Sequence, residues 1–386
     1  MNHPTRRSAL LAGAGAATAV GLAACGSADQ ETSSGTAASS GGSGTTTVKL
    51  QLQWVTQGQF AGYFAALDQG YYSDEGLDVQ ILEGGSDIVP QTVLAQGQAD
   101  YAIAWVPKAL ASREQGAAIT NVAQIYQRSG TLQVSFTKTG ITAVEGLKGK
   151  KVGNWGFGNE YELFAAMTAA GLDPSSDVEL VQQQFDMLGL LQGDIDAAQA
   201  MTYNEFAQLL EAENPDTGSL FTAADFNVLN WNDVGTAMLQ DAVWASTEKL
   251  ADTAYQQQTV KFLKASIKGW VFARDNPEEA RDIVVAKGST LGASHQLWQV
   301  NEVNKLVWPA AGGAGLIDAT AWEQTVQIAM DTKNAEGQTV ITEEPDEDAW
   351  TNDYVQQALD ELTSAGVDVK GAAFAPETVT LAAGGA

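Results

Sequence analysis

The alternation of short apolar strands with helical segments constrains the fold more than any other feature of this sequence. Residues 48–54 place Val, Leu, Leu and Trp at every second position, as expected of a strand with one buried face. Residues 60–67 then fit a helix that ends at Gly70, and further strands are predicted over 78–82 and 101–104. Strands separated by helices favour parallel sheets covered by helices, which is an α/β fold.

The length of the chain predicts two lobes. About 340 residues follow residue 47, and a single hydrophobic core usually stops growing at about 250–300 residues. Residues 94–102 and 190–198 share Leu, Gln, Gly, Asp and Ala in register, and the predicted strands at 48–54 and 150–155 both end in a tryptophan. These internal similarities indicate two lobes of similar build.

The N-terminus is typical of an exported lipoprotein. Arg6 and Arg7 precede an apolar stretch that is short for a bilayer span, and Leu22-Ala23-Ala24-Cys25 resembles a lipoprotein cleavage site. Cys25 would become the lipidated first residue, and the paired arginines also resemble a twin-arginine export signal. A transmembrane anchor is the alternative, but the flanking residues match processing better. The predicted location is the outer face of the cytoplasmic membrane.

Composition excludes several classes of function. The chain has 20 Lys and Arg against 47 Asp and Glu, a net charge of −27, which disfavours nucleic acid as a partner. Cys25 is the single cysteine, so neither a disulfide nor a cysteine metal site is expected. His3 and His295 are the two histidines, and no catalytic triad, phosphate-binding loop or zinc motif can be assembled. We therefore expect a binding protein without a cofactor rather than an enzyme.

Aromatic and amide side chains recur where the predicted strands end. Ligands of open parallel sheets bind at the carboxyl ends of the strands, and planar heterocycles are held by stacking faces together with a few fixed polar groups. Packing of these tryptophans in the core is the alternative. The predicted ligand-binding residues are Trp54, Gln57, Gln59, Phe60, Trp105, Asn154, Trp155, Gly156, Phe157, Gly158, Asn159, Glu160, Tyr203, Asn204, Glu205, Trp231 and Asp233.

Specific roles are expected for a few of these residues. Trp54 and Trp155 are predicted to face each other across a cleft, one from each lobe. Glu160 or Asp233 could accept a hydrogen bond from a ring amine or ring N–H. Gly156 and Gly158 would let the backbone approach the ligand.

Several blocks of the sequence carry a family resemblance. Residues 53–63 and 69–79, together with 97–101, 147–153 and 193–197, resemble the solute-binding proteins of bacterial ABC importers. Within them the chain is similar to the branch related to thiamine-pyrimidine synthases. It departs from that branch in lacking the cysteine-rich iron motif and the reactive histidine of the synthases. It also carries glutamines, Gln57 and Gln59, where the family often has Asn or His.

The resemblance implies an architecture and a function. The fold would be a two-lobe periplasmic-binding-protein-like fold of type II, with mixed, mainly parallel sheets and two hinge crossings. The predicted division is a signal peptide at 1–25, a flexible linker at 26–47, lobe I at 48–138 plus 239–386, and lobe II at 139–238.

A monomer would capture a planar nitrogen heterocycle by hinge closure and deliver it to an ABC permease. A thiamine pyrimidine precursor is the first expectation. Riboflavin, or an alkanesulfonate or nitrate-type solute, is the alternative, and a synthase-like enzyme is disfavoured.

Overall fold

The computed structural model describes residues 45–385. The predicted signal peptide, Cys25 and nearly all of the predicted linker lie outside the described residues. Within residues 45–385, no helix has the length and apolar character that a membrane span requires.

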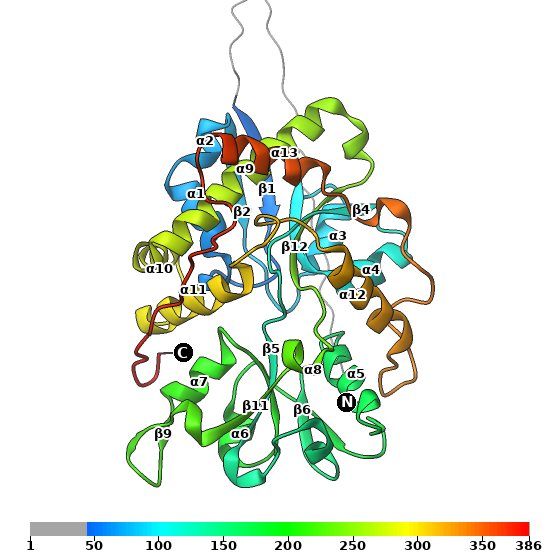
Figure 1. Cartoon of the computed structure of the whole chain (residues 1–386), viewed down its shortest axis with the longest axis vertical. Helices are drawn as coiled ribbons and strands as arrows, with labels where there is room; N and C mark the ends of the chain where they lie inside the picture. Colours follow the sequence, from blue (N-terminus) through cyan, green and yellow to red (C-terminus); the bar gives the residue numbers. More distant parts are fainter. Residues whose placement is uncertain (1–44, 386) are drawn as a thin grey trace, which may run out of the picture. The chain divides into compact units, whose positions relative to one another are not determined.

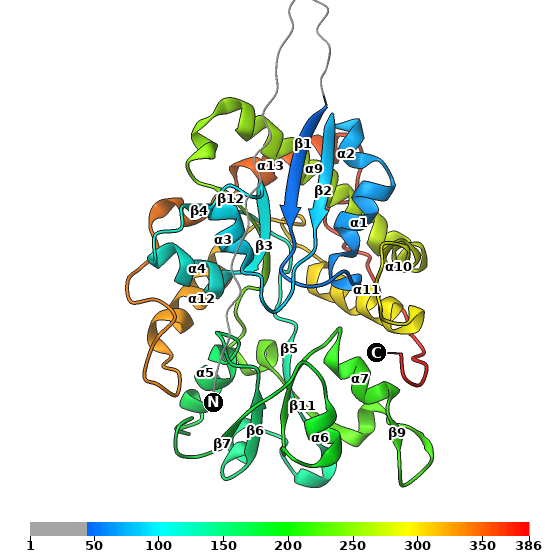
Figure 2. The same cartoon turned by 180° about the vertical axis from the view of Figure 1, so that it is seen from behind.

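Lobe I, as we use the term, is built around a five-stranded sheet of order β2-β1-β3-β12-β4 (Figures 1 and 2). β1 runs parallel to β2 and β3, whereas β12 runs antiparallel to both β3 and β4. The strands span Thr46–Gln51 (β1), Leu77–Leu82 (β2), Tyr101–Trp105 (β3), Ile119–Gln124 (β4) and Asp241–Ser246 (β12).

Alternate residues of these strands enter two different cores, so helices cover both faces of the sheet. In β3, Tyr101 and Ile103 face one core, and Ala102 and Ala104 face the other. The first core is completed by α1 (Ala61–Asp68), α2 (Tyr71–Asp74), α9 (Thr253–Asp275), α10 (Pro277–Ala286), α11 (Ala293–Val307) and α13 (Asp353–Ser364). The second core is completed by α3 (Pro90–Ala95), α4 (Val106–Glu114) and α12 (Ala319–Asp331).

Lobe II is built around an antiparallel sheet of order β11-β5-β8, next to the parallel pair β6-β7. A bridge between Val152 and Ala197 joins the two groups of strands. The strands are Thr131–Phe136 (β5), Lys151–Asn154 (β6), Glu179–Gln182 (β7), Ala198–Met201 (β8) and Phe226–Asn230 (β11), with a small hairpin of Glu213–Asn214 (β9) and Ser219–Leu220 (β10). The helices are Tyr161–Ala169 (α5), Leu188–Gln192 (α6), Glu205–Glu211 (α7) and Trp231–Val234 (α8).

Short 3-10 helices complete the described structure. The one at Gly58–Phe60 (η1) leads from the first strand into α1. The others lie at Thr137–Thr139, Val144–Leu147, Ala223–Asp225, Lys249–Ala251 and Glu347–Ala349.

The predicted α/β fold is confirmed, and the pairing of strands refines it. The chain passes from the first sheet to the second between β4 and β5 and returns between β11 and β12, which gives two crossings. The antiparallel pairs all involve β5 or β12, which border these crossings, apart from the β9-β10 hairpin. β5 pairs inside lobe II although the predicted lobe II begins at residue 139, so the sheets place the first crossing earlier.

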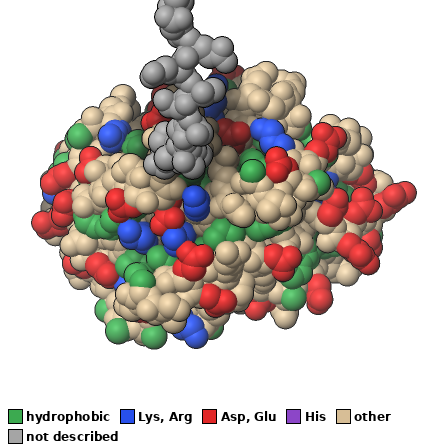
Figure 3. Space-filling model, turned by 90° about the horizontal axis from the view of Figure 1, so that it is seen from above, with side chains coloured by type: hydrophobic (Ala, Val, Ile, Leu, Met, Phe, Trp, Pro, Cys, Tyr) green, Lys and Arg blue, Asp and Glu red, His purple; other side chains and the backbone are tan. Residues whose placement is uncertain are grey.

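The surface reflects the composition. Acidic side chains are spread over the face in Figure 3 and outnumber the basic ones there. Acidic side chains on the surface favour solubility, and their negative charge disfavours an anionic partner.

Candidate functional site

A cavity of about 920 Å³ is lined by residues of both lobes. Small-molecule sites typically measure about 300–1,000 Å³, so this cavity lies near the upper end of that range. Its walls come from the segments that follow β1, β2, β3, β6, β7 and β8, from the start of α3 and from α4, and from residues 339–340 after α12. The cavity therefore lies at the carboxyl ends of strands from both lobes.

Aromatic rings from the two lobes meet in this cavity. Trp54 and Trp105 of lobe I line it together with Trp155 and Tyr203 of lobe II. Phe185, in the loop after β7, packs against both indoles: its ring centroid lies 4.9 Å from that of Trp54 and 5.9 Å from that of Trp155. Trp54 and Trp155 are thus connected through a third ring that the sequence prediction missed.

A buried carboxylate on β12 orients three side chains of the cavity. Asp241 accepts hydrogen bonds from Gln53 Nε2 (2.8 Å), Gln59 Nε2 (3.0 Å) and Trp105 Nε1 (2.8 Å). Burial raises the pKa of Asp241 to about 6, and the three hydrogen bonds act in the opposite direction. Asp241 escaped the sequence prediction because it begins a strand rather than following one.

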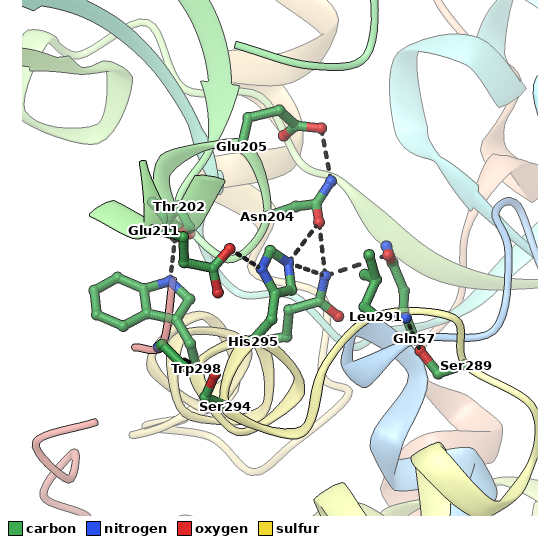
Figure 4. A network of polar contacts seen from close by, with 12 residues as sticks. Gln57, Thr202, Asn204, Glu205, Glu211, Ser289, Leu291, Ser294, His295 and Trp298 are labelled. Atoms are coloured by element: carbon green, nitrogen blue, oxygen red, sulfur yellow. Dashed lines mark hydrogen bonds and ion pairs between the residues drawn. The ribbon is translucent and has the colours of Figure 1, made fainter. Parts of the chain in front are cut away.

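The amides of the site bond mainly to one another. Gln57 Nε2 donates to Gln59 Oε1 at 2.9 Å, and Gln299 Nε2 donates to both Gln57 Oε1 (3.2 Å) and Asn204 Oδ1 (2.8 Å). Asn204 Nδ2 donates to Glu205 Oε1 at 2.7 Å. The pKa of the Glu205 carboxyl is raised because it is buried. This chain of amides crosses from lobe I to lobe II (Figure 4).

The loop after β6 has an unusual backbone. Gly156, Phe157 and Gly158 all have positive φ angles, of 67°, 53° and 84°. Glycine adopts this conformation readily, whereas Phe157 does not. Asn154 Oδ1 accepts from Gly156 N (2.5 Å) and Glu160 Oε2 accepts from Gly158 N (2.9 Å), so these two side chains support the loop. Phe157 is 87% exposed at the rim of the cavity.

Lys108 is the basic residue among those that line the cavity. Its ammonium lies 4.9 Å from the ring centroid of Trp105, a distance that suits a cation–π contact. Burial lowers the pKa of Lys108 to about 8, although Glu160 and Asp241 act to raise it.

The structure brings together most of the predicted site residues. Those that line the cavity are Trp54, Gln57, Gln59, Trp105, Trp155, Phe157, Gly158, Asn159, Tyr203, Asn204 and Glu205. Lining residues absent from the prediction include Gln53, Lys108, Tyr161, Phe185 and a run of glutamines at 182–184.

Six predicted residues do not line the cavity. Phe60 ends η1 just before α1 and is fully buried in the lobe I core, and Trp231 begins α8 and is fully buried in a lobe II core. Asp233 borders a separate pocket on lobe II. The remaining three are Asn154, Gly156 and Glu160, which shape the loop described above.

Within residues 45–385, no group of His, Cys, Asp and Glu side chains has the arrangement of a metal site. The polar groups that reach the cavity are mainly amides. Together with the aromatic rings, they suit an uncharged or weakly charged planar ligand.

Comparison with known proteins decides the family. The sequence model of the family described as NMT1/THI5 like matches residues 57–280. The chain belongs to this family. The resemblance to thiamine-pyrimidine-synthase-like proteins is therefore confirmed.

Relatives of this NMT1/THI5-like protein include binding proteins and enzymes. A formylaminopyrimidine-binding protein of Halalkalibacterium halodurans is 25% identical over 72% of this chain and 83% of its own. The riboflavin-binding protein RibY of Chloroflexus aurantiacus is 26% identical over 73% of this chain and 79% of its own. A 4-amino-5-hydroxymethyl-2-methylpyrimidine phosphate synthase of Legionella pneumophila is 22% identical over 61% and 72%.

A solved structure supports the fold. The periplasmic aliphatic sulphonate binding protein SsuA of Escherichia coli superposes with a TM-score of 0.54 at 15% identity, covering 73% of this chain and 90% of that chain.

Proposed function

We propose that this protein is the extracytoplasmic substrate-binding component of an ABC importer and that it captures a planar nitrogen heterocycle between its lobes. The observation that carries the proposal is the cavity, in which aromatic rings from both lobes surround a set of oriented amides. Two relatives named for binding a pyrimidine and riboflavin point to the same class of ligand.

The geometry suits capture by closure. Trp54 and Phe185 lie on different lobes and touch across the cavity, so separation of the lobes exposes both rings to solvent. A planar ligand bound against them gains stacking contacts from each lobe only when the lobes approach, and those contacts stabilise the closed form. Asp241 keeps Gln53, Gln59 and Trp105 in fixed orientations, which lowers the entropic cost of binding.

The ligand we propose first is a thiamine pyrimidine precursor. Riboflavin is the second candidate, because a cavity of about 920 Å³ has room for a larger ring system. An alkanesulfonate or a nitrate-type anion would depend on Lys108 as its cation.

Export and anchoring complete the proposal. A signal peptide at 1–25, lipidation of Cys25 and a linker at 26–47 would tether a monomer to the outer face of the cytoplasmic membrane, next to its permease.

Catalysis is the competing function, since synthases belong to the same family. The sequence lacks the cysteine-rich iron motif of that branch, because its single cysteine is Cys25. We therefore propose a binding role without chemistry.

A thermal-shift screen tests the function directly. The purified protein is heated with formylaminopyrimidine, 4-amino-5-hydroxymethyl-2-methylpyrimidine, riboflavin or taurine, each with a buffer control. Bound ligand stabilises the folded state by about RT ln(1 + [L]/Kd), so one pyrimidine should raise Tm. A shift with riboflavin alone would replace the first ligand by the second. No shift with any of the aromatic compounds would refute the proposal.

A further inference from the structure

The ammonium group of Lys108 lies at the cavity without a hydrogen-bond partner. Lys108 is in the first turn of α4 and lines the cavity. Among residues 45–385, no backbone or side-chain group forms a hydrogen bond or an ion pair with its Nζ, and Glu160 and Asp241 act on it through their charge. The face of Trp105, at 4.9 Å, offsets positive charge but offers no lone pair. The three N–H donors of this ammonium are therefore left for a ligand.

The side chain of Lys108 is held from two sides. Trp105, over which the ammonium lies, is itself fixed by donating from Nε1 to Asp241 at 2.8 Å. On the other side, Lys108 Cγ lies 3.9 Å from the place that a β-carbon on Gly158 would occupy. The stem thus lies between lobe I and the 156–158 loop of lobe II. A donor held in this way binds an acceptor at a lower entropic cost than a free lysine does.

Negative charge is already supplied to this ammonium by the protein. Glu160 and Asp241 act to raise the pKa of Lys108, and Glu205 lines the same cavity. These carboxyl groups are used by other donors. Glu160 accepts from the backbone of the 156–158 loop, Glu205 accepts from Met201 N at 2.9 Å, and Asp241 accepts from three side chains. The ammonium therefore lacks an acceptor rather than a countercharge, and a fully anionic ligand would add a like charge beside three acidic groups.

The start of α4 reinforces the preference for an acceptor. No side chain caps this helix, whose first residue is Val106. The uncapped start of a helix carries partial positive charge, which favours oxygen acceptors and disfavours further donors. An amino group of a ligand placed here would bring its own hydrogens toward the ammonium and leave both groups without a partner.

We infer that Lys108 selects ligands whose planar ring system carries a carbonyl oxygen, by donating a hydrogen bond from Nζ to that oxygen. The inference rests on the proposed function and narrows it. A carbonyl oxygen supplies the missing acceptor without adding a full negative charge. Of the candidate ligands, formylaminopyrimidine and riboflavin carry a carbonyl oxygen, whereas 4-amino-5-hydroxymethyl-2-methylpyrimidine carries none. Lys108 is then a specificity-determining residue of the cavity.

Two bicyclic heterocycles of the same size test this inference. Lumazine carries carbonyl oxygens at the two ring positions where 2,4-diaminopteridine carries amino groups, so the pair exchanges acceptors for donors on one ring system. Titration calorimetry at neutral pH gives the Kd of each compound. We expect the unsubstituted protein to bind lumazine about tenfold or more tightly than 2,4-diaminopteridine, since a hydrogen bond from a charged donor is replaced by two facing donors.

Lys108→Met removes the ammonium but keeps an unbranched stem beside Gly158. This variant should bind lumazine about tenfold or more weakly, and its Kd for 2,4-diaminopteridine should change by less than about threefold. Lys138→Met is the matched control, because the ammonium of Lys138 also lies 4.9 Å from a ring centroid, that of Phe136, but outside the cavity. It should keep the preference of the unsubstituted protein.

The outcomes separate this inference from the proposed function. Equal affinities of the unsubstituted protein for the two compounds, or a preference for lumazine that survives Lys108→Met, would overturn the inference alone. Binding of neither compound would count against the inference and the proposed function together. If Lys108→Met does not fold, as urea unfolding would show, the preference of the unsubstituted protein compared with Lys138→Met decides the question.

Discussion

Asp241 should make the protein less stable at neutral pH than a neutral side chain in its place would. Its pKa is raised from 3.8 to about 6, because burial disfavours the carboxylate. The unfolded chain therefore loses this proton first as pH rises, and the folded chain loses it near pH 6. Between these values the folded state binds more protons, so its stability falls as pH rises. The difference between 3.8 and about 6 corresponds to about 3 kcal/mol at 1.36 kcal/mol per pH unit.

Asp241→Asn isolates this contribution. The amide resembles the protonated carboxyl in shape and charge, and it does not lose a proton as pH rises. Relative to the unsubstituted protein, the stability of the variant should therefore be lowest near pH 4, where Asp241 of the folded protein is still protonated. The free energy of unfolding of the variant, measured relative to the unsubstituted protein, should increase by about 2 kcal/mol between pH 4 and pH 7, because the unfolded chain has already lost part of this proton at pH 4. Urea unfolding followed by tryptophan fluorescence at four pH values gives this difference directly. A difference that is constant across the range would refute the reasoning.

The same substitution should weaken binding. An Asn side chain has one acceptor oxygen where the carboxylate has two, so Gln53, Gln59 and Trp105 cannot all keep their partners. We expect the affinity for the ligand found in the thermal-shift screen to fall about fivefold or more. Each side chain that loses its hydrogen bond to residue 241, and with it its fixed orientation, should cost about 1 kcal/mol of binding free energy. A variant that is more stable at pH 7 and binds less well would indicate that the buried carboxylate is retained for function.

Two aromatic substitutions test the walls of the cavity by calorimetry. Trp54→Ala should weaken ligand binding at least tenfold, since truncation of a stacking ring costs more than about 1.4 kcal/mol. Trp350 is a similarly exposed tryptophan outside the cavity, so Trp350→Ala should leave Kd unchanged. Equal effects of the two substitutions would mean that the site lies elsewhere. Phe185→Ala should weaken binding about two- to tenfold, because it removes a ring that contacts a tryptophan on each lobe. Phe221→Ala, in an aromatic cluster of lobe II away from the cavity, is its control, and an unchanged Kd for Phe185→Ala would contradict the role of that ring.

Local sequence rules identified several residues that line the cavity. The alternation in β1 predicts a strand that leads to Trp54, which lies just beyond the end of β1 at Gln51, and the strand ends of a sheet meet at one edge. The same rule misplaced Trp231, because the apolar face of a short helix turned that ring into the core of lobe II. Nothing local in the sequence distinguishes a strand-end tryptophan that faces the core from one that faces the cavity.

Long-range pairing could not be read from the sequence. Asp241 meets Gln59 across 182 residues, and His295 meets Glu211 across 84 residues. Both contacts depend on how the lobes and their strands are arranged, which composition and periodicity do not encode. The amides at Gln57 and Asn204 were expected to serve the ligand, yet Gln57 bonds to Gln59 and Gln299 within lobe I, and Asn204 accepts from Gln299 across the lobes.

The central place of β12 has a consequence for how the chain folds. β4 joins the lobe I sheet only through β12, and β12 is synthesised after the whole of lobe II. A nascent chain that stops before residue 241 therefore leaves β3 with an open edge and β4 without a neighbour, a condition that invites aggregation. Lobe I cannot mature as the N-terminal half emerges from the ribosome, and its assembly must wait for the far side of an inserted domain. Any cellular factor that shields exposed strands would have to act on this protein until nearly two thirds of it has been made.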